Sequence, residues 1–291
     1  MRKVKLAAIQ MKCEKETEKN IEKAVKMTKE AAKNGANIIL LPELFENVYF
    51  CQEKKYENYE LATSLDENKA IKELKKVAQE MNVVIPVSFY ERDINVLYNS
   101  VAIIDAGGDI LGIYRKTHIP DDHFYQEKFY FTPGNTGFKV WNTKFGKIGV
   151  GICWDQWFPE CARSMAVLGA EIILYPTAIG SEPVLDCDSM PHWQRCMQGH
   201  SASNIVPVVA ANRIGEEVVS PCPENNMQSS SLTFYGSSFI TNETGQIMCQ
   251  ASRDKEDILY YETDLNEVQN MKMSWGLYRD RRPECYFPIC K

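Results

Sequence analysis

Short apolar runs alternate along the chain with longer segments in which apolar and charged residues follow a helical period. Residues 4–10 form the first apolar run, which predicts a buried strand. In residues 17–33, apolar side chains recur every three or four positions among lysines and glutamates, which predicts an amphipathic helix. Asn34-Gly35 follows this segment and is typical of a helix end.

The same alternation continues through the rest of the chain. Further strands are predicted at residues 38–41, 83–88, 98–104, 110–114, 147–152, 171–175 and 206–211. Further helices are predicted at residues 67–81, 159–168 and 190–204. Hairpin strands are predicted within residues 231–240, 246–250 and 258–263.

This order of elements predicts an α/β fold. Repeated strand–helix–strand units indicate sheets covered by helices, and the turn-rich residues 105–109 indicate a hairpin inside one of the sheets. We therefore expect a two-sheet sandwich with mixed sheets and outer helices. No shift in composition divides the chain, so residues 1–291 are expected to form a single domain. Residues 220–231, rich in Ser, Pro and Asn, are expected to form a mobile surface loop.

The composition is that of a mildly acidic protein, with 44% hydrophobic residues and a formal net charge of -6. Because a surplus of basic residues is missing, neither nucleic acid nor a membrane is an expected partner. The N-terminal apolar run is followed at once by Gln10, Lys12 and Glu14, so it is too short for a signal peptide or a membrane span. We expect a cytoplasmic protein.

Ten cysteines are scattered from Cys13 to Cys290 without a CxxC pair, and four histidines accompany them. This spacing argues against a zinc ribbon or a redox motif, and the reducing conditions of the cytosol argue against a disulfide framework. Most of the cysteines are therefore expected to be small buried apolar residues.

Three residues of catalytic type, Glu43, Lys116 and Cys153, each lie at the carboxyl end of a predicted strand. Active sites of α/β sheets collect there, because side chains are accessible and yet held by a rigid base. A carboxylate buried in the apolar run around Glu43 would need a partner, and it could take a proton from a thiol. Taken singly, each residue has a plainer interpretation: a turn-capping acid, a solvated lysine and a buried cysteine.

The motifs around these residues occur together and in a fixed order. They are Leu-Pro-Glu-Leu-Phe, Tyr-Arg-Lys-Thr-His-Ile-Pro and Gly-Ile-Cys-Trp-Asp-Gln-Trp-Phe-Pro-Glu. This combination resembles the nitrilase superfamily over nearly the whole chain. The resemblance implies a four-layer α-β-β-α sandwich, with Glu43 as the base, Lys116 as the oxyanion-binding cation and Cys153 as the nucleophile, and no metal or organic cofactor.

The superfamily also has a second glutamate, which Glu127 in Phe-Tyr-Gln-Glu-Lys-Phe-Tyr-Phe matches. By this resemblance Glu127 would orient Lys116 and position water, and the alternative is an acid paired with its neighbour Lys128. The backbone N–H of Trp154 would complete the oxyanion hole.

Within the superfamily, several stretches are most similar to plant-type N-carbamoylputrescine amidases. These stretches are residues 153–160, 175–183, 192–200, 209–215 and 274–283. The similarity implies hydrolysis of a terminal ureide to putrescine, ammonia and carbon dioxide. The distal ammonium of such a substrate needs a carboxylate or an aromatic face, and Glu182 is the candidate, with Tyr49 and Trp154 as walls. Alternatively, Glu182 is a solvated loop acid.

Other interpretations remain open from the sequence. The substrate could be β-ureidopropionate, an ω-amide or a nitrile, and the chain could be a binding scaffold without turnover. A papain-like pair between Cys153 and a histidine is a further alternative, although it would leave Glu43 and Lys116 without roles. By analogy with the superfamily we expect a homo-oligomer built from dimers, with residues 265–291 in subunit contacts. Arg279, Arg281 and Arg282 would join such a contact, and the plainer alternative is a solvated basic cluster.

Overall fold

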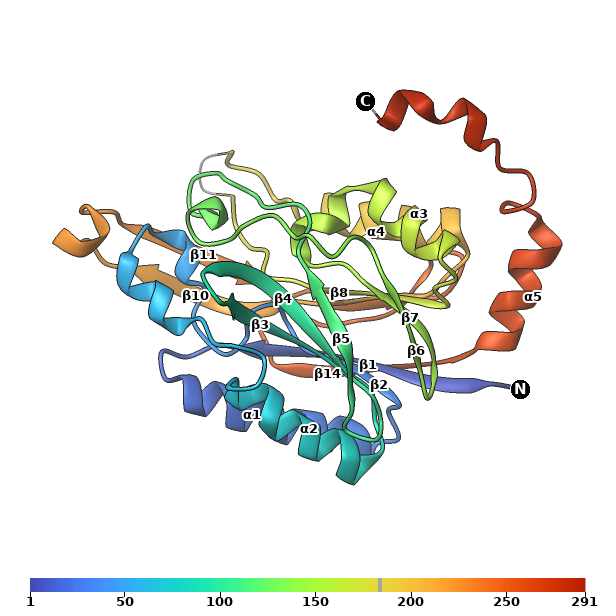
Figure 1. Cartoon of the computed structure of the whole chain (residues 1–291), viewed down its shortest axis with the longest axis horizontal. Coiled ribbons are helices and arrows are strands. Elements are labelled where there is room, and N and C mark those ends of the chain that lie inside the picture. Colours follow the sequence, from blue (N-terminus) through green and yellow to red (C-terminus); the bar gives the residue numbers. More distant parts are fainter. Residues whose placement is uncertain (183–184, 291) are drawn as a thin grey trace.

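Two β-sheets pack face to face, and helices cover the outer side of each (Figure 1). The structure is a computed structural model that describes residues 1–182 and 185–290. The helices α1 (Thr17–Lys33) and α2 (Lys69–Met81) lie on one side of the sandwich, and α3 (Pro159–Val167) and α4 (Met190–Asn204) lie on the other. The four layers confirm the predicted α-β-β-α sandwich.

The first sheet is organised around the long strand β1 (Lys3–Lys12). It pairs in parallel with β2 (Ile38–Leu40) and β10 (Arg213–Val219), and antiparallel with β14 (Asp257–Asp264). The antiparallel partner of β10 is β11 (Ser230–Tyr235). A bridge between Ile38 and Val84 joins this sheet to the meander β3 (Ile85–Asp93), β4 (Val96–Ile104) and β5 (Ile110–Arg115).

The second sheet has six strands in the order β13-β12-β9-β8-β7-β6. Its parallel centre consists of β7 (Gly146–Val150), β8 (Ile172–Pro176) and β9 (Val208–Ala211). The flanking strands β6 (Val140–Thr143), β12 (Phe239–Thr241) and β13 (Ile247–Gln250) are antiparallel to their neighbours. Both sheets are therefore mixed, as predicted.

Three apolar layers hold the sandwich together. Between the sheets, Leu6 and Leu40 belong to one cluster with Val150 and Leu174. The amphipathic faces of α1 and α2 bury side chains such as Leu74 against the first sheet, and a third cluster lies beneath α3 and α4. Burial of apolar side chains on this scale is the main stabilising contribution to such a fold.

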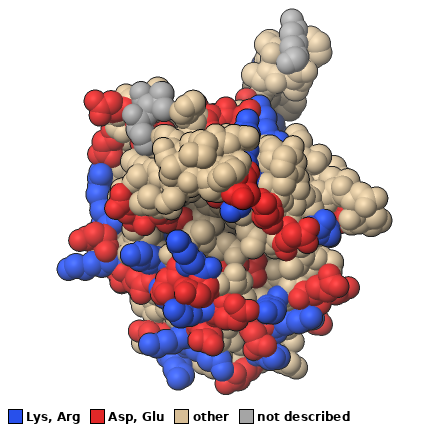
Figure 2. Space-filling model, turned by 90° about the vertical axis from the view of Figure 1, so that its left-hand side faces the viewer, with Lys and Arg blue, Asp and Glu red and all other residues tan. Residues whose placement is uncertain are grey.

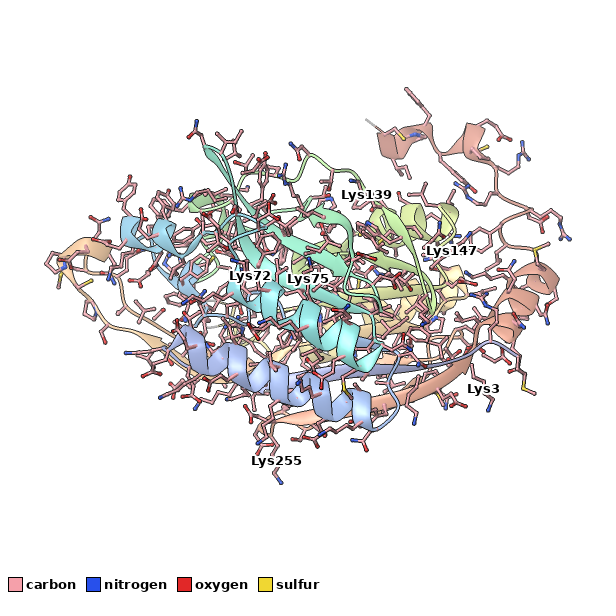
Figure 3. The ribbon with its side chains drawn as sticks, turned by 60° about the horizontal axis from the view of Figure 1, so that its bottom comes forward. Lys3, Lys72, Lys75, Lys139, Lys147 and Lys255 are labelled. Carbon is pink, nitrogen blue, oxygen red and sulfur yellow. The ribbon has the colours of Figure 1, made fainter. Side chains whose placement is uncertain are left out.

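The outer sides of the helices are charged. Lys72 and Lys75 project from the exposed side of α2, and Lys3, Lys139, Lys147 and Lys255 also lie at the surface (Figure 3). Lysines and arginines are interspersed with acids on the face shown in Figure 2. These solvated lysines contrast with Lys116, which is completely buried.

The predicted strands and helices up to residue 211 are all present, with boundary shifts of a few residues. Three further elements were not predicted: β6, β10 and α5 (Leu265–Trp275). The strand β10 was not predicted because charged residues are expected at the surface, whereas Arg213 and Glu217 pair with each other inside the protein. In α5, Met273 and Trp275 are each 69% exposed, so the helix lacks a single apolar face.

Short 3-10 helices occupy several of the connections. They are Phe50–Gln52, Tyr56–Leu61, Glu127–Phe129, Cys153–Trp157, Pro223–Asn225, Pro283–Cys285 and Phe287–Cys290. Within the predicted loop 220–231, Asn225 is buried and bonds to Ser220 O and Gln228 O. The mobility of the loop 220–231 stays a prediction.

All ten cysteines are unpaired, but only Cys13, Cys51, Cys153 and Cys161 are buried. The expectation that most of them are buried is therefore wrong. Three of the cysteines are exposed. Two of them, Cys285 and Cys290, lie near the C-terminus, in a part of the chain that extends outside the sandwich (Figure 1). Among the described residues, no helix has the length and apolar character to cross a membrane.

Candidate active site

Lys116 lies between two carboxylates in the interior. Its Nζ donates to Glu43 Oε1 at 2.8 Å and to Glu127 Oε2 at 2.6 Å. Glu43 follows β2, Lys116 follows β5, and Glu127 begins a 3-10 helix, so three connections meet at one point. Glu127 bonds to Lys116 rather than to its sequence neighbour Lys128.

The two carboxylates keep Lys116 charged. Burial lowers the pKa of the Lys116 ammonium, but Glu127 and Glu43 outweigh this effect and raise its pKa well above the ordinary value. For Glu127, burial raises the pKa of the carboxyl to about 7, although Lys116 opposes this shift. A fixed positive charge therefore lies in a site from which water is largely excluded, where electrostatic interactions are strong.

The carboxylate of Glu43 has one occupied and one open oxygen. Oε1 accepts hydrogen bonds from Lys116 and from Asn99 Nδ2, the latter at 2.6 Å. Oε2 is buried and has no hydrogen-bond partner among the described residues. Because a buried acceptor without a partner is costly, this oxygen is poised to receive a proton from a thiol or from water.

Cys153 begins the 3-10 turn that follows β7. Its φ angle is +41°, a left-handed conformation that is unfavourable for a residue with a side chain. The preceding Gly151 allows this tight path, since a Cβ there would lie 2.9 Å from Tyr175 and 3.0 Å from Cys161. The thiol is 6% exposed, and Sγ contacts Ala178 O at 3.8 Å.

The charges of the cluster act directly on Cys153. Burial raises the pKa of its thiol well above the ordinary value, Glu43 raises it further, and Lys116 lowers it. Glu43 and Lys116 are therefore close enough to Cys153 to shift the pKa of its thiol. Because the pKa is raised, the thiol is protonated at rest. Such a thiol needs a base before it can act as a nucleophile.

The histidines have other partners. His118 Nδ1 lies 2.7 Å from Asp155 Oδ1, the ring of His192 packs on Trp157, and His200 Nδ1 lies 3.2 Å from the hydroxyl of Tyr175. The ring of His123 packs against Phe124. In the described part of the chain, none of the four imidazoles contacts the thiol of Cys153. The geometry gives no support to a papain-like pair.

Of the two proposed walls, Tyr49 lies at the site and Trp154 projects outward. Tyr49 is buried, and its hydroxyl donates to Glu127 Oε1 at 2.7 Å. The indole of Trp154 is 39% exposed and packs edge-on against Trp157.

Glu182 is half-buried and lines a cavity of about 440 Å³ together with Asp188, Tyr235 and Arg253. No ion pair to Glu182 is present in the described chain, and burial, with Asp122 adding to it, raises the pKa of its carboxyl to about 7. Pro183, the last residue of the 175–183 motif, lies outside the described residues.

Tyr235, at this cavity, is influenced by both Glu182 and Cys153. Burial raises the pKa of Tyr235 above its ordinary value, and Cys153 and Glu182, when ionised, raise it further. Burial also raises the pKa of Tyr125, and the same two groups raise it further. The hydroxyl of Tyr125 accepts a hydrogen bond from Gly180 N at 3.0 Å. Both Glu182 and Cys153 therefore lie close enough to Tyr125 and Tyr235 to influence their pKa values.

The carbon-nitrogen hydrolase family model matches residues 5–273, which is most of the chain. The chain belongs to the carbon-nitrogen hydrolase family. A carbon-nitrogen hydrolase from Helicobacter pylori G27 has the same fold, with a TM-score of 0.91 and 35% identity over 99% of each chain. An amidase from Nesterenkonia sp. AN1 shares the fold at a TM-score of 0.77 and 20% identity, over 99% of this chain and 98% of its own.

Two further relatives are more similar in sequence than these solved structures. The N-carbamoylputrescine amidase of Oryza sativa subsp. japonica is 53% identical over 98% of this chain and 93% of its own length. The citrullinase of Francisella tularensis subsp. tularensis is 51% identical over 100% of this chain and 99% of its own length.

Arg213 is a buried residue whose role the sequence reasoning missed. Its guanidinium donates to Glu43 O at 2.8 Å, Leu44 O at 2.9 Å and Asn47 O at 3.1 Å, and it pairs with Glu217 at 3.0 Å. Arg213 thus fixes the turn that carries Glu43. The signal was available, because Arg213 and Glu217 are spaced to face the same side of a strand.

We expect Arg213→Met to destabilise this hydrolase by about 3–5 kcal/mol, because it leaves Glu217 and several buried carbonyls without their partner. Urea denaturation measures the effect. Arg2→Met is the control, since it removes an exposed ion pair with Glu171 and should cost about 0–1 kcal/mol. Adding Glu217→Gln to Arg213→Met should restore part of the loss, and a loss no larger than that of the control would contradict this role.

Proposed function

We propose that this protein is a cysteine amidohydrolase in which Cys153 is the nucleophile, Glu43 the base and Lys116 the cation that stabilises the oxyanion. The observation that carries the proposal is the open Oε2 of Glu43, buried beside a protonated thiol and a charged lysine. Base, nucleophile and electrophilic cation are the three groups that acyl transfer requires.

In the first half of the reaction, Glu43 takes the proton from Cys153 as sulfur adds to the ureide carbonyl carbon. The negative charge that forms on the carbonyl oxygen is stabilised by Lys116 and by the backbone N–H of Trp154. Glu43 then returns the proton to the terminal nitrogen, and ammonia leaves. The product of this half is a carbamoyl thioester on Cys153.

In the second half, a water molecule hydrolyses this thioester. Glu43 takes a proton from the water, and Glu127 orients Lys116 and the water. The thiol of Cys153 is regenerated, and the released carbamic acid decomposes to the amine and carbon dioxide. The metal-free, cofactor-free cycle follows the pattern inferred from the superfamily motifs.

The proposed substrate is N-carbamoylputrescine. Its support is the identity of 51–53% with plant N-carbamoylputrescine amidases over nearly the whole chain. Glu182 supplies a half-buried carboxylate without a cationic partner in the described residues, at a cavity that Tyr235 also lines. An ammonium at the distal end of the substrate is the complement of such a group. We also propose a cytoplasmic location, because ten unpaired cysteines suit a reducing compartment. A role in polyamine formation follows from putrescine as the proposed product.

A second candidate substrate class is that of ureido amino acids. Arg253 lines the same cavity as Glu182 and forms an ion pair with Asp188 at 2.7 Å. A guanidinium could hold a substrate carboxylate while Glu182 holds an amino group, and a relative that is 51% identical is a citrullinase. Ammonia release from carbamoylputrescine, citrulline, β-ureidopropionate and a simple ω-amide, measured side by side, ranks these classes.

We expect Cys153→Ser and Glu43→Gln to lower kcat for carbamoylputrescine by at least about 10²-fold to 10⁴-fold, because each removes a group that acts in the transition state. Ammonia release measures the loss, and thermal melting checks that each variant folds. Glu46→Gln is the matched control, since Glu46 is a buried glutamate on the same turn that bonds to Asn68. Near-normal kcat in either active-site variant would refute the proposal.

We expect the preference for a cationic ureide to depend on pH through Glu182. The carboxyl of Glu182, with its pKa raised to about 7, is ionised above that pH and neutral below it. The ratio of kcat/KM for carbamoylputrescine to that for N-butylurea should therefore fall as the pH drops below 7, by about tenfold per unit at the limit.

Glu182→Gln should lower this ratio at pH 8 and remove its pH dependence. Asp188→Asn, at a carboxylate of the same cavity that is already paired with Arg253, serves as the control and should keep the break near pH 7. Equal effects of Glu182→Gln on both ureides would exclude Glu182 from ammonium binding.

We further propose that residues 265–291 contact a second copy of the chain. Within this segment α5 packs on the sandwich, with Leu265 buried and Lys272 Nζ donating to Ala170 O, and the part nearest the C-terminus extends away from it (Figure 1). The segment borders a mainly apolar cavity of about 1040 Å³ over α3. Leu168, Trp275 and Ile289 are 57%, 69% and 65% exposed. Apolar surface of this extent is typical of a protein interface.

We expect the double variant Leu168→Glu and Ile289→Glu to reduce the oligomeric mass, because it places two charges in the proposed contact. Size-exclusion chromatography with light scattering measures the mass. Ile94→Glu is the control, at an apolar residue that is 84% exposed on the turn between β3 and β4. An unchanged mass in the double variant would place the subunit contact elsewhere.

A further inference from the structure

Asp155 is a buried acid that the reaction does not use, and it makes four hydrogen bonds. Its Oδ2 accepts from Ile152 N at 3.0 Å and from the hydroxyl of Tyr114 at 2.7 Å. Its Oδ1 accepts from His118 N at 3.0 Å and lies 2.7 Å from His118 Nδ1. The side chain is 0% exposed, so both oxygens depend on these partners.

The partners of Asp155 belong to the two segments that carry the nucleophile and the cation. Ile152 immediately precedes Cys153, whereas Tyr114 and His118 flank Lys116 at a distance of two residues on either side. The imidazole of His118 is itself stacked on Phe158, with ring centroids 3.6 Å apart and planes 3° apart. One carboxylate thus connects the turn after β7 with the connection after β5.

This connection matters because the backbone at Cys153 is strained. A φ of +41° at a residue with a side chain persists only where the surroundings hold it. The bond from Ile152 N to Asp155 fixes the chain one residue before Cys153, and the bonds to His118 fix the chain just after Lys116. Without this carboxylate, the turn could relax and move Sγ away from Glu43 and Lys116.

We propose that Asp155 is a positioning residue that holds the thiol of Cys153 in register with Lys116. The proposal rests on the proposed function, since it assumes that Cys153 is the nucleophile. Asp155 does not exchange protons with substrate. Its contribution is to fix the separation of two reacting groups, where a displacement of about 1 Å can cost about 10²-fold in rate.

The test measures the reactivity of Cys153 without relying on the identity of the substrate. The protein is treated with iodoacetamide, and the rate of alkylation at Cys153 is followed by peptide mass spectrometry, which separates it from the other nine cysteines. Asp155→Asn keeps the shape of the side chain but replaces one acceptor oxygen by a donor, so a bond to Ile152 N or to His118 N is lost.

We expect Asp155→Asn to lower the alkylation rate of Cys153 by about 10²-fold and to lower kcat by a similar factor. KM should stay within about threefold, because the cavity at Glu182 is unchanged. The matched control is Asp105→Asn, at an acid that also accepts from two backbone N–H groups, those of Ala106 and Lys144, on the turn between β4 and β5. Asp105→Asn should leave the alkylation rate within about twofold of the wild type.

A purely structural role would give a different result. Asp155→Asn would then lower the melting temperature while Cys153 is alkylated at the wild-type rate, or both variants would slow alkylation equally, and either outcome overturns the proposal. If Asp155→Asn does not fold, Tyr114→Phe decides, because it removes one of the four bonds. We expect it to slow alkylation by about threefold to tenfold, and a wild-type rate would overturn the proposal. If the wild type releases no ammonia from any ureide while this order of alkylation rates holds, the proposed substrate class fails and the positioning role stands.

Discussion

The ion pairs of the buried Lys116 ammonium are the interactions on which the active site depends. Burial of a charge is tolerated only where opposite charges replace the lost water, and Glu43 and Glu127 provide that replacement at 2.8 and 2.6 Å. The dependence is mutual, because without Lys116 each buried carboxylate would lose its cationic partner. This interaction joins β2, β5 and the connection before β6 into one unit. The order of the sheets serves to bring these strand ends together.

Two residues outside this cluster hold the backbone of the groups in it. Arg213 binds the backbone of the turn at Glu43. Asp155 binds the backbone just before Cys153 and just after Lys116. Arg213 and Asp155 both bind peptide groups, so they fix the backbone positions from which the candidate catalytic side chains extend. This role explains why such polar groups are buried in an otherwise apolar sandwich.

The sandwich could be predicted from the sequence, and the candidate catalytic residues could be proposed from it, but the residues that support them could not. Strand and helix periods identified the elements that have one apolar face, and the three motifs identified Glu43, Lys116 and Cys153. The strand β10 was missed because its inward positions are Arg213 and Glu217, which a hydrophobic pattern interprets as surface. Trp154 was expected as a wall of the pocket, yet its indole is 39% exposed. A hydrophobic pattern does not show which charged residues pair with each other in the interior.

The charges at the site also determine how the thiol is activated. Glu43 and Glu127 outnumber Lys116, so a resting thiolate at Cys153 would add a negative charge to a cluster that already has an excess of acids, and the raised pKa of the thiol reflects this. If the proton moves to Glu43 while sulfur attacks, one carboxylate charge disappears as one oxyanion charge forms beside Lys116. The total charge of the buried cluster then stays constant through the step. A buried site with little water to respond favours this coupled transfer over a preformed thiolate, because no change in net charge has to be solvated.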